Sequence, residues 1–117
     1  MTEKILAECT SQILEELEKA CNKYPGFCNL FLREYTDLKL IRERLNWIHS
    51  ESDDEGRRLQ YSVQTTLDEE VTEVYEAYAE GDYIHCLEEL AQVGCVVIRA
   101  MAWIHEHHKE ELDGEDD

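Results

Sequence analysis

Residues 67–93 read LDEEVTEVYEAYAEGDYIHCLEELAQV, two helix-like runs joined by a Gly-Asp pair. Glycine readily takes the left-handed conformation that ends a helix, and aspartate readily caps the helix that follows. We therefore expect Gly81 to end one helix and Asp82 to cap the next. Because this connection is so short, the two helices are expected to form an antiparallel hairpin.

Acidic residues occupy positions in both runs where a packed helix is normally apolar. Glu70 falls within the stripe formed by Val63, Leu67 and Val74, and Glu89 interrupts an aliphatic stretch of the second run. A buried carboxylate costs free energy, and proteins that place several on a core face usually use them to bind a cation. The hairpin therefore predicts a divalent-metal site.

Distance from the turn sets the height of each residue along the hairpin, at about 1.5 Å per residue. Glu73 and Glu89 each lie about eight residues from the turn, and Glu70 and Gln92 about eleven, so two levels form roughly 12 and 16 Å from it. The members of each pair within a helix are spaced i, i+3 and share one face. Three carboxylates and one amide oxygen suit Mg²⁺, or else Mn²⁺.

The alternative is that these acids simply face solvent in a structural bundle that binds no metal. Glutamate pairs are common on exposed helix surfaces, and we expect that ordinary role for Glu69 and Glu88. The mirrored spacing across a tight turn, with Glu70 inside the apolar stripe, favours the metal site over this alternative.

The remaining pattern predicts an all-α fold, a four-helix bundle with the metal site on its last hairpin. We expect helices over 2–23, 28–49, 57–80 and 83–109, with Thr2 capping the first. Together they form a single domain over residues 1–112, followed by an acidic tail at 113–117. The helix over 83–109 is apolar almost all round, which indicates a buried helix and a homodimer or homotetramer with this helix near the interface.

Composition narrows the class of protein further. The net charge of −17 argues against broad binding to nucleic-acid phosphates and suits a cation-binding protein. Charged and polar residues interrupt the apolar helix, so no membrane span is expected. Five cysteines without a disulfide framework, and no signal peptide at the N-terminus, indicate the cytoplasm.

Two motifs on the hairpin are similar to those of a known enzyme family. Residues 69–73 read E-E-V-T-E and residues 89–92 read E-L-A-Q. They resemble the E-E-x-x-E and E-x-x-D motifs of the MazG-like nucleoside triphosphate pyrophosphohydrolases, relatives of the dimeric dUTPases and dCTP pyrophosphatases. The resemblance covers roughly residues 59–104 and rests on residue types, spacing and the hairpin together.

The resemblance implies hydrolysis of a nucleoside triphosphate to a monophosphate and pyrophosphate, with Mg²⁺ as cofactor. It implies that Glu70, Glu73, Glu89 and Gln92 are metal ligands, and that Glu69 orients or deprotonates the attacking water. Gln92 stands where the family usually has Asp, and an amide oxygen brings no charge to the metal. A second hypothesis is therefore a non-catalytic MazG-like module that binds a nucleotide or a protein partner.

Arg99 lies two helical turns beyond Gln92 on the same line of the helix. It suits contact with substrate phosphate oxygens, or equally a buried ion pair with a carboxylate such as that of Glu70. His85, one turn before Glu89, is expected to be exposed.

Two further groups of side chains receive ordinary structural interpretations. Tyr35, Trp47 and Trp103 are expected in the core or a dimer interface rather than stacked on a base. The histidines at 105, 107 and 108 resemble a transition-metal handle, but their place at a helix end, where the dipole favours a positive charge, is sufficient explanation.

Overall fold

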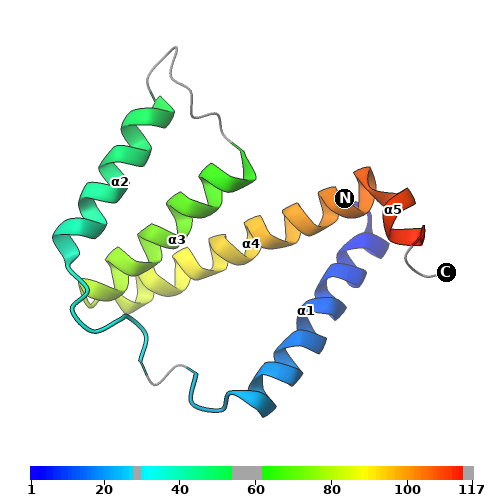
Figure 1. Ribbon diagram of the computed structural model, residues 1–117, viewed down its shortest axis with the longest axis horizontal. Helices are drawn as coiled ribbons and strands as arrows, with labels where there is room; N and C mark the ends of the chain where they lie inside the picture. The colour runs from blue at the N-terminus through cyan, green and yellow to red at the C-terminus, as the bar shows by residue number, and fades with distance from the viewer. Residues whose placement is uncertain (28–29, 54–61, 115–117) are drawn as a thin grey trace. The chain divides into compact units, whose positions relative to one another are not determined.

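Every regular element in the described part of the chain is an α-helix. The computed structural model describes residues 1–27, 30–53 and 62–114. Figure 1 shows its helices, which are α1 (Glu3–Lys23), α2 (Leu38–Asp53), α3 (Val63–Ala79), α4 (Tyr83–His107) and α5 (Lys109–Gly114). The all-α prediction is confirmed, with a fifth, short helix that was not predicted.

The chain divides into two compact units, and α4 contributes to both. One unit comprises Met1–Leu30 and Val97–Asp117, and the other comprises Phe31–Val96. The first holds α1, α5 and the end of α4, whereas the second holds α2, α3 and the start of α4. The single domain expected over residues 1–112 stays a prediction.

In the first unit, α1 begins where the sequence predicts. The Thr2 side chain accepts a hydrogen bond from the Ile5 amide at 3.1 Å and caps the helix. The apolar stripe of α1 is covered only near its start, because Cys9 is buried whereas Ile13 and Leu17 are exposed. The rest of the stripe therefore presents an open apolar surface.

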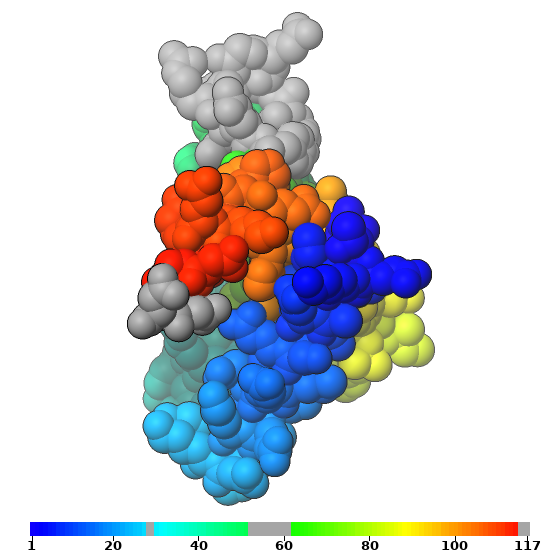
Figure 2. Space-filling view, turned by 90° about the vertical axis from the view of Figure 1, so that its right-hand side faces the viewer, coloured from blue at the N-terminus to red at the C-terminus, as the bar shows by residue number. Residues whose placement is uncertain are grey.

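The start of α1 lies beside the end of α4, as the blue and orange segments of Figure 2 show. A carboxylate oxygen of Glu8 lies 3.9 Å from Nδ1 of His105, and the N-terminal amine lies 3.9 Å from the carboxylate of Glu106. The predicted helix over 83–109 ends at His107, and α5 follows it directly. The tail predicted from residue 113 therefore begins inside a helix, while residues 115–117 lie outside the described part.

In the second unit, the helix predicted over 28–49 begins ten residues later, at Leu38. Local hydrogen bonds compete with a helix here. The Thr36 hydroxyl donates to the Arg33 carbonyl at 2.6 Å, and the Asp37 carboxylate accepts from the Lys39 amide at 2.9 Å. Tyr35 also takes a positive φ of 63°, which no residue inside an α-helix adopts. Asp37 thus marks the true start of the helix.

The hairpin of α3 and α4 forms as predicted. Gly81 has φ of 78°, in the left-handed region, and Asp82 accepts a hydrogen bond from the His85 amide at 3.1 Å. At the other end, Ser62 caps α3 by accepting from the Thr65 amide at 3.1 Å. The predicted start of this helix at residue 57 falls outside the described residues.

A small core ties the hairpin together. Its buried members are Val74 and Ala77 of α3 and Cys86 of α4, and Phe31, Tyr78 and Val93 pack against them. The Cys86 thiol donates to the Val74 carbonyl at 3.7 Å, which joins the two helices directly. The Phe31 ring stacks on Tyr78 with centroids 4.0 Å apart, so the segment before α2 closes one side of this core.

Helix α2 packs antiparallel against α3. Near its start Arg42 pairs with Glu80 and lies 3.8 Å from Glu76, whereas His49, near its end, lies 3.6 Å from Glu69. Leu45 and Ile48 are buried on the same helix. Residues later in α2 thus contact residues earlier in α3. This antiparallel alignment places the end of α2 beside Glu69 and Glu73.

Helix α4 is less covered than its apolar sequence predicts. Ile84 and Leu87 are 77% and 69% exposed, and Leu90 is also exposed. A single chain therefore leaves part of α4 uncovered, and its place near an oligomer interface stays a prediction. None of the helices in the described residues combines the length and apolar character needed to cross a membrane.

The cysteines in the described residues form no disulfide. Cys9 and Cys86 are buried, Cys21 and Cys95 are exposed, and all four are free. Burial raises the pKa of the Cys86 thiol, as does the neighbouring Asp82 carboxylate. A thiol held in its neutral form is a weak nucleophile, so Cys86 has a packing role.

Candidate metal centre

Three carboxylates of the hairpin converge on one point. Glu70 and Glu73 project from α3 and Glu89 from α4, and one oxygen from each lies within 4.8 Å of the others. The i, i+3 spacing places the two α3 residues on one face, and the short turn brings α4 alongside. The structure therefore brings Glu73 and Glu89 together at the level nearer the turn, as the sequence predicted.

The burial of these acids is unusual for free carboxylates. Glu89 is only 5% exposed, and Glu70 and Glu73 are half-buried. The Oε2 atoms of Glu70, Glu89 and the adjacent Glu69 are fully buried and have no hydrogen-bond partner among the described residues. An unpaired buried carboxylate oxygen costs several kcal/mol or takes up a proton or a cation, and these oxygens fit a metal ion.

The pKa values of two clustered carboxyls are raised, as their burial leads one to expect. Burial, and after it the neighbouring Glu89 carboxylate, with which Glu70 can share a proton, together raise the pKa of Glu70 from 4.5 to about 7. Burial and Glu89, in the same order, raise the pKa of Glu73 to about 8. Carboxyls that hold protons near neutral pH exchange them readily for a divalent cation, since the cation neutralises the same charge.

A second group shares Glu73 with the first and includes a residue that sequence reasoning missed. His49, near the end of α2, has Nε2 3.6 Å from Oε1 of Glu69 and 3.8 Å from Oε1 of Glu73. One ligand atom from each of these three residues lies within 4.8 Å of the others. Little in the sequence marks His49 as a ligand, because it simply follows Ile48 on the apolar side of α2.

Contact with α2 makes Glu69 less exposed than the sequence predicted. The sequence placed both Glu69 and Glu88 on solvent-facing surface, and Glu88, with a side chain 66% exposed, is there. The Glu69 side chain is only 19% exposed, because it lies against His49. The expectation is therefore wrong for Glu69, which stands beside the cluster.

His85 approaches the cluster from α4. Its Nε2 lies 3.5 Å from Oε1 of Glu89, and its Nδ1 lies 3.6 Å from a carboxylate oxygen of Glu88. The side chain is half-exposed, in line with the sequence prediction.

Gln92 lies off the buried line of α4. The buried line of α4 runs through Cys86, Glu89 and Val93, and Gln92 is turned by roughly 100° from Val93. Its side chain is exposed, and Glu70 approaches Glu89 instead. The role of Gln92 as a metal ligand opposite Glu70 stays a prediction.

Other predicted residues lie apart from the cluster. Arg99 is exposed, so the buried ion pair considered for it is not formed, and a contact with phosphate stays a prediction. Trp47, Trp103 and Tyr35 are also exposed, so they are not core residues of this chain. Trp47 lies under the Arg44 guanidinium and Trp103 stacks on His107.

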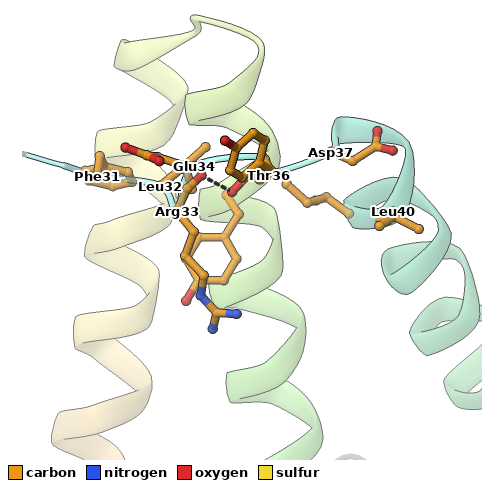
Figure 3. Close-up of a pocket in the computed structure, with 10 residues that line it drawn as sticks. Phe31, Leu32, Arg33, Glu34, Thr36, Asp37 and Leu40 are labelled. Atoms are coloured by element: carbon orange, nitrogen blue, oxygen red, sulfur yellow. Dashed lines mark hydrogen bonds between the residues drawn. The ribbon is translucent and has the colours of Figure 1, made fainter.

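A surface cavity of about 460 Å³ lies where the chain enters α2 (Figure 3). The segment 31–37 forms most of its wall, and Leu40, Ile41 and Tyr75 complete it. None of the clustered carboxylates is among the residues that line it. The cavity is therefore separate from the candidate metal centre.

Comparison of the chain with models of protein families, with curated proteins and with solved structures finds no match.

Proposed function

We propose that this protein is a Mg²⁺-dependent nucleoside triphosphate pyrophosphohydrolase of the MazG-like kind. The observation that carries the proposal is the buried Glu89, which meets Glu70 and Glu73 with no lysine or arginine to balance them among the described residues. Mn²⁺ is an alternative cofactor. The motif resemblance supplies the reaction, and the geometry supports the cation that such a reaction requires.

The proposed roles follow from position and charge. Glu70, Glu73 and Glu89 hold Mg²⁺, which supplies positive charge to the phosphate oxygens and acidifies water when bound. Glu69, with a buried and unpaired oxygen beside the cluster, accepts a proton from the attacking water. Water adds across the bond between the α- and β-phosphates, and the products are a nucleoside monophosphate and pyrophosphate. A triphosphate would otherwise be repelled by these carboxylates.

The direct test is an activity screen. We expect the protein, incubated with a panel of NTPs and dNTPs and with Mg²⁺ or Mn²⁺, to release pyrophosphate and a monophosphate from at least one nucleotide. Chromatography of the products distinguishes this cleavage from release of inorganic phosphate. If no nucleotide is cleaved at high protein concentration with either metal, the proposed activity is wrong.

A second candidate function is a non-catalytic module that binds a nucleotide or a partner. Gln92 favours it, because an exposed, uncharged amide stands where the family motif has a carboxylate, and an amide oxygen binds a cation more weakly. Under this function Mg²⁺ and a nucleotide both raise the melting temperature, but no pyrophosphate appears. The same screen, read alongside thermal denaturation, therefore separates the two functions.

We also propose that the working form is a homodimer or homotetramer built on α4. The exposed apolar residues Ile84, Leu87 and Leu90 belong to this helix, and single-chain packing leaves them in water. We expect light scattering at micromolar concentration to give at least twice the 13.8 kDa mass of the chain. A Leu87→Glu variant should shift the mass toward that of the monomer, and a monomeric wild type would contradict the proposal.

A further inference from the structure

The carboxylate cluster has a second side, facing α2, that adds two residues to the ligands proposed for Mg²⁺. On that side lie the imidazole of His49 and the carboxylate of Glu69, and Glu73 stands between them and the first group. The buried Oε2 of Glu69 has no hydrogen-bond partner among the described residues, and neither has that of Glu89, which belongs to the first group. Two sets of ligand atoms thus share one carboxylate.

We propose that His49, Glu69 and Glu73 bind a second divalent cation of the transition-metal type, with Glu73 bridging it to the first. This inference rests on the proposed function for the first ion but assigns a new ligand and a different metal preference. The neutral imidazole nitrogen favours Mn²⁺, Co²⁺ or Zn²⁺ over Mg²⁺, which prefers oxygen. The centre is thus mixed, with oxygen ligands on one side and a nitrogen ligand on the other.

The separations support a shared ion rather than a direct ion pair alone. His49 Nε2 is 3.6 and 3.8 Å from its two carboxylate oxygens, longer than a strong charge-assisted hydrogen bond of about 2.7–2.9 Å. An ion with ligand bonds of roughly 2.0–2.2 Å fits between groups at this separation with only small side-chain movements. The competing explanation is that His49 merely supplies a positive charge.

Metal-free protein titrated with Co²⁺ tests the proposal. The imidazoles at the end of α4 can bind Co²⁺ on their own, so the measurement uses a His107→Gln, His108→Gln background. We expect two Co²⁺ ions per chain and an exchangeable, paramagnetically shifted imidazole N–H resonance. Adding His49→Gln should remove that resonance and weaken one of the two ions at least about tenfold.

A charge-preserving variant separates the two explanations for His49. His49→Lys retains a positive charge but not the imidazole nitrogen, so it should lose the second Co²⁺ ion as His49→Gln does. Two ions retained in His49→Lys, or a single ion in the background that keeps His49, would overturn the inference. Circular dichroism verifies that each variant is folded, and the shifted resonance in the His107→Gln, His108→Gln background requires no substitution within the proposed site.

The outcome is independent of the activity screen. Pyrophosphate release with Mg²⁺ and only one Co²⁺ ion per chain would leave the proposed function standing without the second site. Two Co²⁺ ions without cleavage of any nucleotide would establish the second site and refute the activity.

Discussion

Replacing Glu89 with Gln is expected to abolish Mg²⁺ binding and pyrophosphate release while making the metal-free protein more stable. Glu89 is the most buried of the clustered acids, and its replacement removes a proposed metal ligand and one of three converging carboxylates. Removal even of a group that supports a ligand costs about 10–100-fold, so a direct ligand should cost at least about 100-fold in metal affinity. We expect the metal-free free energy of unfolding near pH 8 to rise by about 1 kcal/mol or more.

The neighbouring Glu88→Gln variant is the matched control. It makes the same chemical change one residue away, at a side chain that is 66% exposed. Its activity, metal affinity and stability should stay close to those of the wild type, because exposed charges contribute little. Equal loss of activity in both variants would show that the general acidity of α4, rather than the cluster, is what matters.

The second large effect is a loss of stability with rising pH in the absence of metal. The pKa values of Glu70 and Glu73 are raised from 4.5 to about 7 and about 8, so the folded state holds protons that the unfolded state releases. The stabilisation is complete below about pH 4.5 and is lost as the pH rises through 7 and 8. We expect Tm to fall by at least roughly 5 °C between about pH 5.5 and about pH 8.5.

Mg²⁺ should reverse this loss, because the cation replaces the protons. The groups that surround the two carboxyls are Glu69 on α3, Glu89 on α4 and His49 on α2. Thermal denaturation with and without Mg²⁺ at both pH values measures the effect, which should be larger at the higher pH. A metal-free Tm that increases with pH over this range would contradict the charge states that the cluster requires.

The hairpin was predictable because its determinants are local. Gly81 and Asp82 suffice to end one helix and start the next, and their spacing from the acids sets the level of the site nearer the turn. The angle of Gln92 around α4 is not set in this local way, since it depends on which residues pack against α3. Burial of Cys86, Glu89 and Val93 determines that angle.

His49 and the true position of Glu69 were beyond sequence reasoning for a different reason. Both depend on how α2 aligns with α3, a long-range register decided by contacts such as those of Arg42 with Glu76 and Glu80. The sequence also gave no clear sign that the turn at Thr36 and Asp37 delays the start of α2. Pairing between helices that are separated by a long connector is not encoded in their individual periodicities.

The central claim is that Glu70, Glu73 and Glu89 together hold a divalent cation. The most direct measurement is Tm of the wild-type protein near pH 8 as Mg²⁺ is added, with NaCl adjusted to keep ionic strength constant. This adjustment matters because the chain carries a net charge of −17, which salt alone screens. We predict a saturable rise, worth about 2.7 kcal/mol at a hundredfold excess over Kd, that is absent in Glu89→Gln. A wild-type Tm that does not respond to Mg²⁺ under these conditions would contradict the account.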